Sequence, residues 1–409
     1  MNDILLISKD ALRADCLSCY GGTIWNTSNI DSLAKSGTIF RNYYTAAPAS
    51  AMSYSSMFSG LNPYELDRSR YTEVKPFDLC PTLFDIMNEK GYENHVIWDE
   101  RWYHHSWRFS RVYGQNTKYH NLKIKQAVGP HYFKGEKIKP QKGARPIIKI
   151  IDTVKEIISG RSRPVFIWIH CPHVFAGRTG YDSDIDLFDD LVGKIVDLFP
   201  RNGIYLTSDH GHMDCNKGIP VYGFHVYEPA IKIPLITPNH FYKKEINEII
   251  SNIQLKNIIL EHRIYPQKFI YSDTQYYLQE NRKLMIRKDS FKYIYNKRNK
   301  TEELYDLKYD SNENVNLLIE HWYDRNRDKN YYLDQIHYYP RWKEAKKTYQ
   351  ELINEKERIW KEGTWRQEFS YKLWNVYKKG IGNFFRTFIK TKKAKGRWNS
   401  TVKRSYHLK

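Results

Sequence analysis

The chain has 409 residues, of which 41% are hydrophobic and 27% charged, so it is long enough for two or three domains with a buried core. Its formal net charge of +19 predicts attraction to an anionic partner such as nucleic acid, anionic lipid or an acidic glycan. The five scattered cysteines argue against a disulfide framework, and no apolar stretch reaches the length of a membrane span. Because the N-terminal segment also lacks a signal-peptide pattern, we expect a cytoplasmic protein that can bind peripherally to the inner membrane face.

The first predicted element is the apolar run over residues 4–7, which is typical of a strand buried on both faces of a parallel sheet. Further strands are expected from Ile39 and over 95–98, 164–170 and 203–207. Helical patterns are expected after Thr27, over 81–90, over 147–158, over 184–199 and over 253–260. This alternation of buried strands and helices predicts an α/β fold.

Polar residues follow three of these strands. Asp10 follows the first strand, His173 follows the strand over 164–170, and Asp209 and His210 follow the strand over 203–207. The carboxyl ends of strands carry the site in open α/β sheets, so these residues are candidate ligands of a divalent metal. A lone aspartate after a strand is also a common helix N-cap, and this alternative stays open for Asp10.

Residues 45–63 (TAAPASAMSYSSMFSGLNP) are unusually rich in hydroxyl groups. Five serines fall within ten positions, namely Ser50, Ser53, Ser55, Ser56 and Ser59. A serine at a helix N-terminus lies where the helix dipole favours negative charge, and beside a metal it can act as a nucleophile. The alternative is a serine-rich loop that caps a helix starting near Ser53.

The C-terminal part of the chain changes character. Residues 269–307 alternate like a small antiparallel sheet, and the chain is helical, charged and aromatic from about Trp342. Residues 371–409 contain no acidic residue, and their basic and aromatic residues interleave at roughly helical spacing. This pattern favours an interfacial helix on anionic lipid, with a solvated tail or a nucleic-acid patch as the alternatives. No recognised nucleic-acid-binding module is present, so we expect no nucleic-acid partner.

Several segments in the same order resemble the sulfatase branch of the alkaline phosphatase superfamily. They include ILLISKDALRADCLSCYGG, SAMSYSSMFSGLNP, FIWIHCPHVF, YLTSDHGH and VYEPAIKIPLI, and the likeness covers about residues 1–318 with gaps. The resemblance implies an α/β/α sandwich with a mainly parallel central sheet and a small antiparallel C-terminal subdomain. It divides the chain into a catalytic domain over 1–250, the subdomain over 251–320 and a basic helical tail over 321–409.

The resemblance also implies a metal site. Asp10, Asp209 and His210 fall at positions that bind one divalent ion in the family, and Ser50 falls at the nucleophile position, which also contacts that ion. The family's second aspartate is replaced here by Ala11. Manganese, zinc and calcium are the candidate ions, and the loss of a carboxylate shifts the expectation from calcium toward manganese or zinc.

Two further histidines, His173 and His225, lie where the family holds the substrate's anionic group or protonates the leaving oxygen. Met52 and Tyr54 stand in place of the proline and arginine that direct oxidation of the nucleophile to formylglycine, so this maturation is not expected. The segment around Ser50 is also similar to that of phosphoethanolamine transferases, which use an unmodified hydroxyl.

The resulting expectation is a metal-dependent hydrolase that cleaves sulfate or phosphate esters through a serine nucleophile. Its substrate would be an anionic ester carried by a glycan or a lipid-linked molecule. Two alternatives stay open. One is a phosphotransferase that modifies a surface glycan or a lipid-linked precursor at the membrane face. The other is a pseudoenzyme scaffold, which the altered nucleophile motif would permit.

Overall fold

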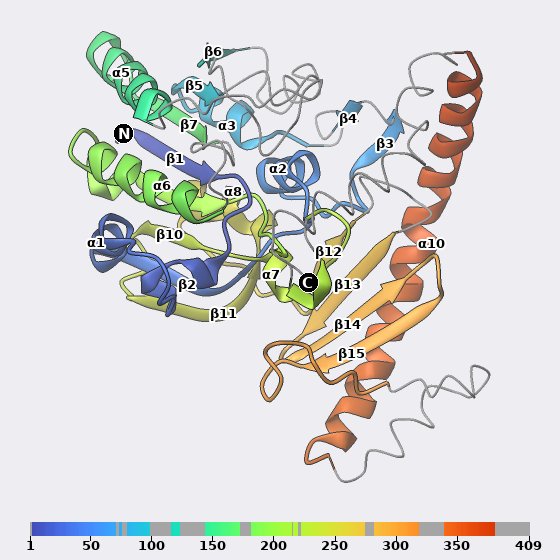
Figure 1. Cartoon of the computed structure of the whole chain (residues 1–409). Helices are drawn as coiled ribbons and strands as arrows, with labels where there is room; N and C mark the ends of the chain where they lie inside the picture. Colours follow the sequence, from blue (N-terminus) through green and yellow to red (C-terminus); the bar gives the residue numbers. More distant parts are fainter. Residues whose placement is uncertain are drawn as a thin grey trace, which may run out of the picture.

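The computed structural model describes residues 2–70, 73–75, 80–98, 116–122, 144–171, 181–214, 216–219, 222–274, 282–318 and 339–380. A nine-stranded sheet dominates it, with strand order β11-β2-β10-β8-β1-β7-β5-β6 and with β9 paired to β2 (Figure 1). Its strands are β1 (Ile4–Lys9), β2 (Gly37–Tyr44), β5 (Glu93–Trp98), β6 (Thr117–Asn121), β7 (Val165–Cys171), β8 (Ile204–Ser208), β9 (Lys232–Ile233), β10 (Leu235–Pro238) and β11 (Glu245–Ser251).

The centre of this sheet is parallel, as the sequence predicts. Strands β8, β1, β7, β5 and β6 all run parallel to one another, and β11 runs parallel to β2. Strand β10 is antiparallel to both β8 and β2, so the sheet is mixed toward one edge. The expected α/β class with a mainly parallel sheet is confirmed.

Helices cover both faces of the sheet, which explains why β1 is apolar throughout. Leu5 and Ile7 pack in one core with α1 (Ser28–Ser36), α5 (Ala144–Gly160) and α6 (Tyr181–Val196). Leu6 points to the other face and packs with α2 (Ser50–Ser59), α3 (Leu83–Glu89) and α8 (Leu255–Glu261). A strand between two helical layers buries every side chain, so it has no polar alternation.

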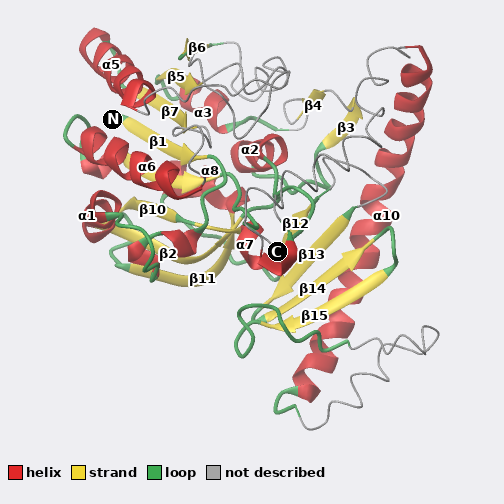
Figure 2. Ribbon diagram, viewed as in Figure 1, coloured by secondary structure: helices red, strands yellow, loops and turns green. Residues whose placement is uncertain are grey.

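A separate antiparallel sheet follows, with strand order β12-β13-β14-β15. Its strands are β12 (Ile270–Asp273), β13 (Lys283–Lys288), β14 (Phe291–Asn296) and β15 (Thr301–Asp306). The long helix α10 (Trp342–Gly380) runs along this sheet (Figure 2), and its Tyr349 and Leu352 share a core with Leu284 and Tyr293. A hairpin of β3 (Asp67–Arg70) and β4 (Glu73–Lys75) completes the strands.

The predicted C-terminal organisation is met in part. The antiparallel sheet and a helix from Trp342 are present, and the first half of that helix is packed on the sheet. The boundaries at residues 250 and 320 stay predictions. Residues 381–409 of the basic tail lie outside the described part. For residues 371–380 the structure describes the helical backbone but not the side chains. No described helix has an apolar run long enough to cross a bilayer.

Gly37 ends α1, as the sequence predicts, but for a different physical reason. The sequence predicts a glycine that ends α1 in a left-handed conformation. The structure ends α1 at that position, but Gly37 is extended, with φ −115°. A Cβ atom there would lie 2.2 Å from the carbonyl oxygen of Thr237 in β10. The glycine is therefore required by the close approach of two strands.

Candidate active site

The strand order brings three of the predicted residues together. Asp10 follows β1 and Asp209 and His210 follow β8, and β1 and β8 are neighbours in the sheet. One ligand atom of each residue lies within 4.8 Å of the others, and all three residues are buried. Among the residues that the structure describes, this is the one group of three or more such side chains close enough to share a metal ion. We call Asp10, Asp209 and His210 the strand-end group.

Backbone groups orient the carboxylate of Asp209. Its Oδ1 accepts hydrogen bonds from the N–H of Ala11 at 3.1 Å and of His210 at 2.8 Å. Its Oδ2 is buried, has no hydrogen-bond partner within the described part, and lies 3.5 Å from His210 Nε2. Asp10 Oδ1 is likewise buried and unpartnered there, at 3.6 Å from the same nitrogen. Leaving two such oxygens unsatisfied is costly, so they mark a site for a missing positive group.

The imidazole of His210 is held so that Nε2 faces the carboxylates. Nδ1 lies 2.8 Å from the carbonyl oxygen of Gly211, and this contact assigns the ring proton to Nδ1. Nε2 then presents a lone pair, as a metal-ligating histidine does. Gly211 is needed at this turn, because a Cβ atom would lie 2.0 Å from the carbonyl oxygen of Pro229.

Ser50 lies beside the strand-end group. It is the first residue of α2, and its Oγ is 3.2 Å from His210 Nε2. The side chain is half-buried, so the hydroxyl is accessible while its surroundings are partly dry. Since α2 begins at Ser50 and not near Ser53, the hydroxyl sits at the positive end of the helix dipole.

The other serines of α2 serve the helix and its anchoring. Ser53 donates a hydrogen bond to the carbonyl oxygen of Asp209 at 2.5 Å and accepts one from the Asn252 amide at 2.9 Å. Ser55 and Ser59 donate to carbonyl oxygens one turn earlier in the helix. Ser53 therefore fixes the start of α2 against the strand-end group, and Ser50 is the serine that faces it.

A hydrogen-bonded network beneath α2 was not predicted from the sequence. The hydroxyl of Tyr54 lies 2.8 Å from His170 Nδ1 and 2.9 Å from Ser8 Oγ, and the Trp168 indole donates to the same Ser8 oxygen at 2.8 Å. Burial lowers the pKa of His170. These partners come from β1 and β7, far away in the chain, so the only sequence signal was a tyrosine where the family has an arginine.

The loop that carries His225 adjoins the site through Tyr222, whose ring centroid lies 4.3 Å from that of His210. His225 itself lines a cavity of about 460 Å³ with Lys283 and Arg298. Burial, aided by the Lys283 charge, lowers the pKa of His225 to about 4. Within the described part no contact joins His225 to Ser50. His173, the second predicted histidine, lies outside the described residues.

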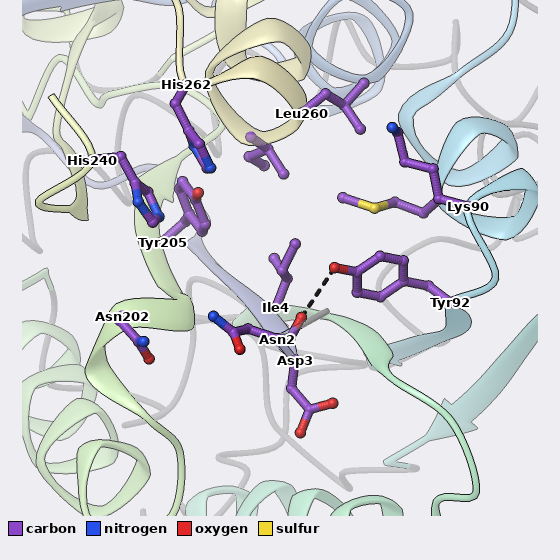
Figure 3. A pocket seen from close by; sticks show the side chains of 12 residues that line it. Asn2, Asp3, Ile4, Lys90, Tyr92, Asn202, Tyr205, His240, Leu260 and His262 are labelled. Atoms are coloured by element: carbon purple, nitrogen blue, oxygen red, sulfur yellow. Dashed lines mark hydrogen bonds between the residues drawn. The ribbon is translucent and has the colours of Figure 1, made fainter.

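A second cavity lies at the amino ends of the central strands, away from the strand-end group (Figure 3). This cavity of about 240 Å³ is lined by residues at the amino ends of strands, such as Asn2 and Tyr92, whose hydroxyl donates to the Asn2 carbonyl oxygen at 3.0 Å. The rings of His240 and His262 stack there with centroids 3.8 Å apart. The cavity contains none of the strand-end residues, so it is separate from the candidate active site.

Comparisons with known proteins identify the fold and the family. The family model described as sulfatase matches residues 2–262. An arylsulfatase of Clostridium perfringens is 30% identical over 95 residues, which are 23% of this chain and 20% of that protein. An N-acetylgalactosamine-6-O-sulfatase of Bacteroides thetaiotaomicron is 32% identical over 102 residues, 23% of this chain and 19% of that protein. The matched segments thus span about a fifth of these relatives.

Structural similarity extends much further along the chain. The crystal structure of a phosphonate monoester hydrolase of Agrobacterium radiobacter superposes with a TM-score of 0.60. The match covers 82% of this chain and 95% of that one, at 14% sequence identity. At this identity the likeness establishes the fold, which is the alkaline-phosphatase-like fold expected from the sequence.

Proposed function

Because the chain belongs to the sulfatase family, we propose that it hydrolyses a sulfate or phosphate ester with the Ser50 hydroxyl as nucleophile. The observation that carries this proposal is the 3.2 Å distance from Ser50 Oγ to His210 Nε2, inside a buried group with two unpartnered carboxylate oxygens. The net charge of +19 supports an anionic substrate. The curated relative named for a sulfated amino sugar supports an acidic glycan as the carrier of the ester.

The donor atoms of the strand-end group fit a divalent metal ion. Two carboxylate oxygens and one imidazole nitrogen converge, and a hydroxyl lies beside them. This set suits manganese or zinc and also admits calcium. We propose that Asp10, Asp209, His210 and Ser50 hold one such ion. When bound, the ion lowers the pKa of the Ser50 hydroxyl and polarises the ester.

The proposed reaction has two steps, and Ser50 takes part in both. Ser50 Oγ attacks the sulfur or phosphorus atom, the new bond to Oγ forms, and the bond to the leaving oxygen breaks. The hydroxyl proton is lost to solvent, and the leaving oxygen takes up a proton. Water then hydrolyses the ester formed on Ser50. The N-terminus of α2 favours the negative charge of the transferred group throughout.

The two histidines receive different proposed roles. A pKa of about 4 keeps His225 neutral at neutral pH, so it suits hydrogen bonding to the anionic group better than protonating the leaving oxygen. Lys283, which shares its cavity, supplies positive charge for the same group. His173 remains the candidate for protonation of the leaving oxygen.

Initial rates on an aryl sulfate and an aryl phosphodiester test the proposal. Metal-stripped protein is assayed with manganese, zinc or calcium added. We expect a metal-dependent rate on at least one ester and its loss in Ser50→Ala. Ser56→Ala is the matched control, because it removes a buried hydroxyl without a hydrogen-bond partner in the described part of the same helix. Most activity retained by Ser50→Ala would refute the mechanism.

The same assay, together with an analysis of bound metal, distinguishes the two alternatives, a phosphotransferase and a pseudoenzyme. A phosphotransferase would pass the group from Ser50 to an alcohol, so added acceptor alcohols would raise turnover of the phosphodiester. Met52 and Tyr54 stand where the formylglycine motif has proline and arginine, so an unmodified Ser50 is expected, and this favours the second candidate over a formylglycine enzyme. A pseudoenzyme would show neither rate nor bound metal.

The basic segment over 371–409 is proposed to bind anionic lipid, which would place the protein at the inner membrane face. The net charge and the absence of acidic residues in this segment support the proposal. Deleting 371–409 should release the protein from vesicles of anionic lipid in a sedimentation assay. Unchanged sedimentation of the shortened chain would contradict it.

A further inference from the structure

The largest of the described cavities is separate from the candidate active site. It measures about 810 Å³, within the range of small-molecule pockets, and none of Asp10, Ser50, Asp209 and His210 lines it. Its wall is formed by the segment after β1, by the edge of β2, by the start of α7 (Glu228–Ile231) and by the turn after β15. Helix α7 lies between the two sheets, so the cavity opens where they meet (Figure 1).

Positive charge predominates in the wall of this cavity. Two acidic residues line it, Asp15 and Glu228. Five basic residues do so, and they are Arg13, Arg41, Lys217, Lys232 and Arg287. This excess favours an anionic occupant.

Three of the five cations are matched by neighbours. Arg13 forms an ion pair with Asp15, and Arg41 forms one with Glu245. Arg287 donates to the Tyr44 hydroxyl and lies 3.9 Å from a Glu228 oxygen. The charge of these three groups is therefore largely compensated without a ligand.

The two lysines, Lys217 and Lys232, form no ion pair with a carboxylate within the described part. Lys217 donates to the backbone carbonyl oxygen of Glu313 and lies over the Tyr227 ring. Lys232 is half-buried, and within the described part its ammonium group makes no hydrogen bond or ion pair. Burial lowers the pKa of Lys232, and the nearest charges include both Glu228 and Arg287. An anion in the cavity would give this ammonium group the partner that it lacks.

The neutral part of the wall indicates what carries the anionic group. Five asparagine side chains line the cavity, together with Ser311. An asparagine amide both donates and accepts hydrogen bonds, so it pairs well with sugar hydroxyl groups. The aliphatic side chains of the wall are limited to Ala14, Pro229 and Leu307, which argues against a lipid tail.

We propose that this cavity, which we name the Lys232 cavity, binds the phosphate or sulfate ester group of an acidic sugar, with Lys232 and Lys217 as the anion ligands and the asparagines as hydroxyl ligands. The site is distinct from the strand-end group and does not depend on the reaction proposed for it.

Calorimetric titration of the full chain tests the proposal with N-acetylglucosamine 6-phosphate as the probe. Inorganic phosphate and N-acetylglucosamine serve as the two parts of that probe. We expect the sugar phosphate to bind more tightly than either part. Lys232→Met should weaken it at least about tenfold, because a charged hydrogen bond to a partly buried anion is lost. Lys243→Met removes an equally charged but exposed lysine outside the cavity and should leave binding unchanged.

Asp209→Asn locates the binding event, since it alters the strand-end group alone. Binding that survives Asp209→Asn and weakens in Lys232→Met supports the Lys232 cavity. Binding that is lost in Asp209→Asn and unaffected by Lys232→Met would overturn it and assign the probe to the catalytic edge. Inorganic phosphate binding as tightly as the sugar phosphate would overturn the sugar part of the proposal.

Chemical labelling of the wild-type protein tests the proposal without a substitution that could disturb folding. Acetic anhydride acetylates accessible lysines, and mass spectrometry of peptides reports each one. The sugar phosphate should slow acetylation of Lys232 several-fold and leave that of Lys243 unchanged. Equal labelling of Lys232 with and without the probe would contradict the proposal.

Discussion

Two buried clusters of charge in this structure are built on opposite principles. In the cluster of Lys292, Glu228, Glu313 and Arg287, the Lys292 ammonium lies 2.9 Å from a Glu228 oxygen and 2.7 Å from a Glu313 oxygen. Lys292 is fully buried, and Glu313 is 1% exposed. In the strand-end group, two carboxylates converge on His210 Nε2, and one oxygen of each has no hydrogen-bond partner within the described part.

The difference separates a buried ion cluster of matched charges from a candidate metal site. Burial opposes ionisation of Glu228, but Lys292 and Arg287 outweigh it and lower the pKa of that carboxyl to about 2. Burial raises the pKa of Glu313, but each of the two glutamates in the Lys292 cluster has an oxygen within 3 Å of the Lys292 ammonium group. In the strand-end group the Asp10 and Asp209 carboxylates both face His210 Nε2, an arrangement that a divalent cation would stabilise.

Asp209→Asn should have the largest effect on function. Removing a ligand carboxylate should lower metal affinity and metal-dependent turnover by more than about 100-fold. Mutating a residue that only hydrogen-bonds to a metal ligand already lowers metal affinity or activity by about 10- to 100-fold. The metal-free variant should be at least as stable as the metal-free wild type, because one of two facing carboxylates is gone. Metal content, initial rates and urea unfolding check the three statements. A metal-free variant that is clearly less stable would place Asp209 among the structural charges.

Lys292→Met should have the largest effect on stability. It leaves Glu228 and Glu313 buried together without their shared cation, which costs about 3–5 kcal/mol in the free energy of unfolding. Urea unfolding measures the loss. Lys194→Met is the matched control, because its ion pair with Asp190 is exposed and worth less than about 1 kcal/mol. Similar losses in the two variants would show that the Lys292 cluster is no stronger than a surface pair.

Removal and return of the metal should shift stability by an intermediate amount. At a free metal concentration one hundred times the dissociation constant, binding to the folded state alone adds about 2.7 kcal/mol to the free energy of unfolding. Thermal unfolding of stripped protein with and without manganese measures this. The shift should vanish in Asp209→Asn and persist in Lys292→Met. A shift of equal size in Asp209→Asn would exclude the strand-end group as the binding site.

The smallest predicted effect concerns the histidine pair His95 and His120. His95 Nδ1 lies 2.9 Å from His120 Nε2, and its Nε2 lies 2.8 Å from Glu93. Burial, with help from the His120 charge, lowers the pKa of His95 to about 4. The unfolded chain therefore binds more protons between pH 6.5 and 4, and stability falls as the pH falls through that window.

His95→Gln should weaken this pH dependence, so the free energy of unfolding should fall less in the variant than in the wild type between pH 7 and pH 5. Urea midpoints at the two pH values measure the slope for both proteins. Wild-type and variant slopes that coincide would mean that His95 does not contribute to acid destabilisation.

Much of the candidate site was predictable because strand ends are local features. The apolar runs that form β1 and β8 each stop at a polar residue, and parallel pairing then places Asp10 beside Asp209 and His210. Ser50 was predictable because hydroxyl-rich segments at helix starts are few. The roles of His173 and His225 came from the resemblance, and the contacts of the described residues do not decide them.

The partners of buried polar side chains were not predictable. Lys292 stands in the strand FKYIYN, where alternation predicts an exposed lysine, yet it is fully buried between two glutamates from other elements. Tyr54 finds His170 in a strand 116 positions away. Such contacts depend on which elements pack together, and a local pattern carries no record of that.

The sequence by itself therefore determined the α/β class, the order of the central elements and the residue types at the carboxyl ends of β1 and β8, because these follow from periodicity and composition along the chain. The tertiary structure alone decided that one carboxylate oxygen each of Asp10 and Asp209 has no hydrogen-bond partner within the described part, while Lys292 lies between Glu228 and Glu313. It also decided that the Lys232 ammonium group faces a cavity and forms no ion pair within the described part. Charge compensation depends on distance and burial in three dimensions, and residues far apart in the chain supply both.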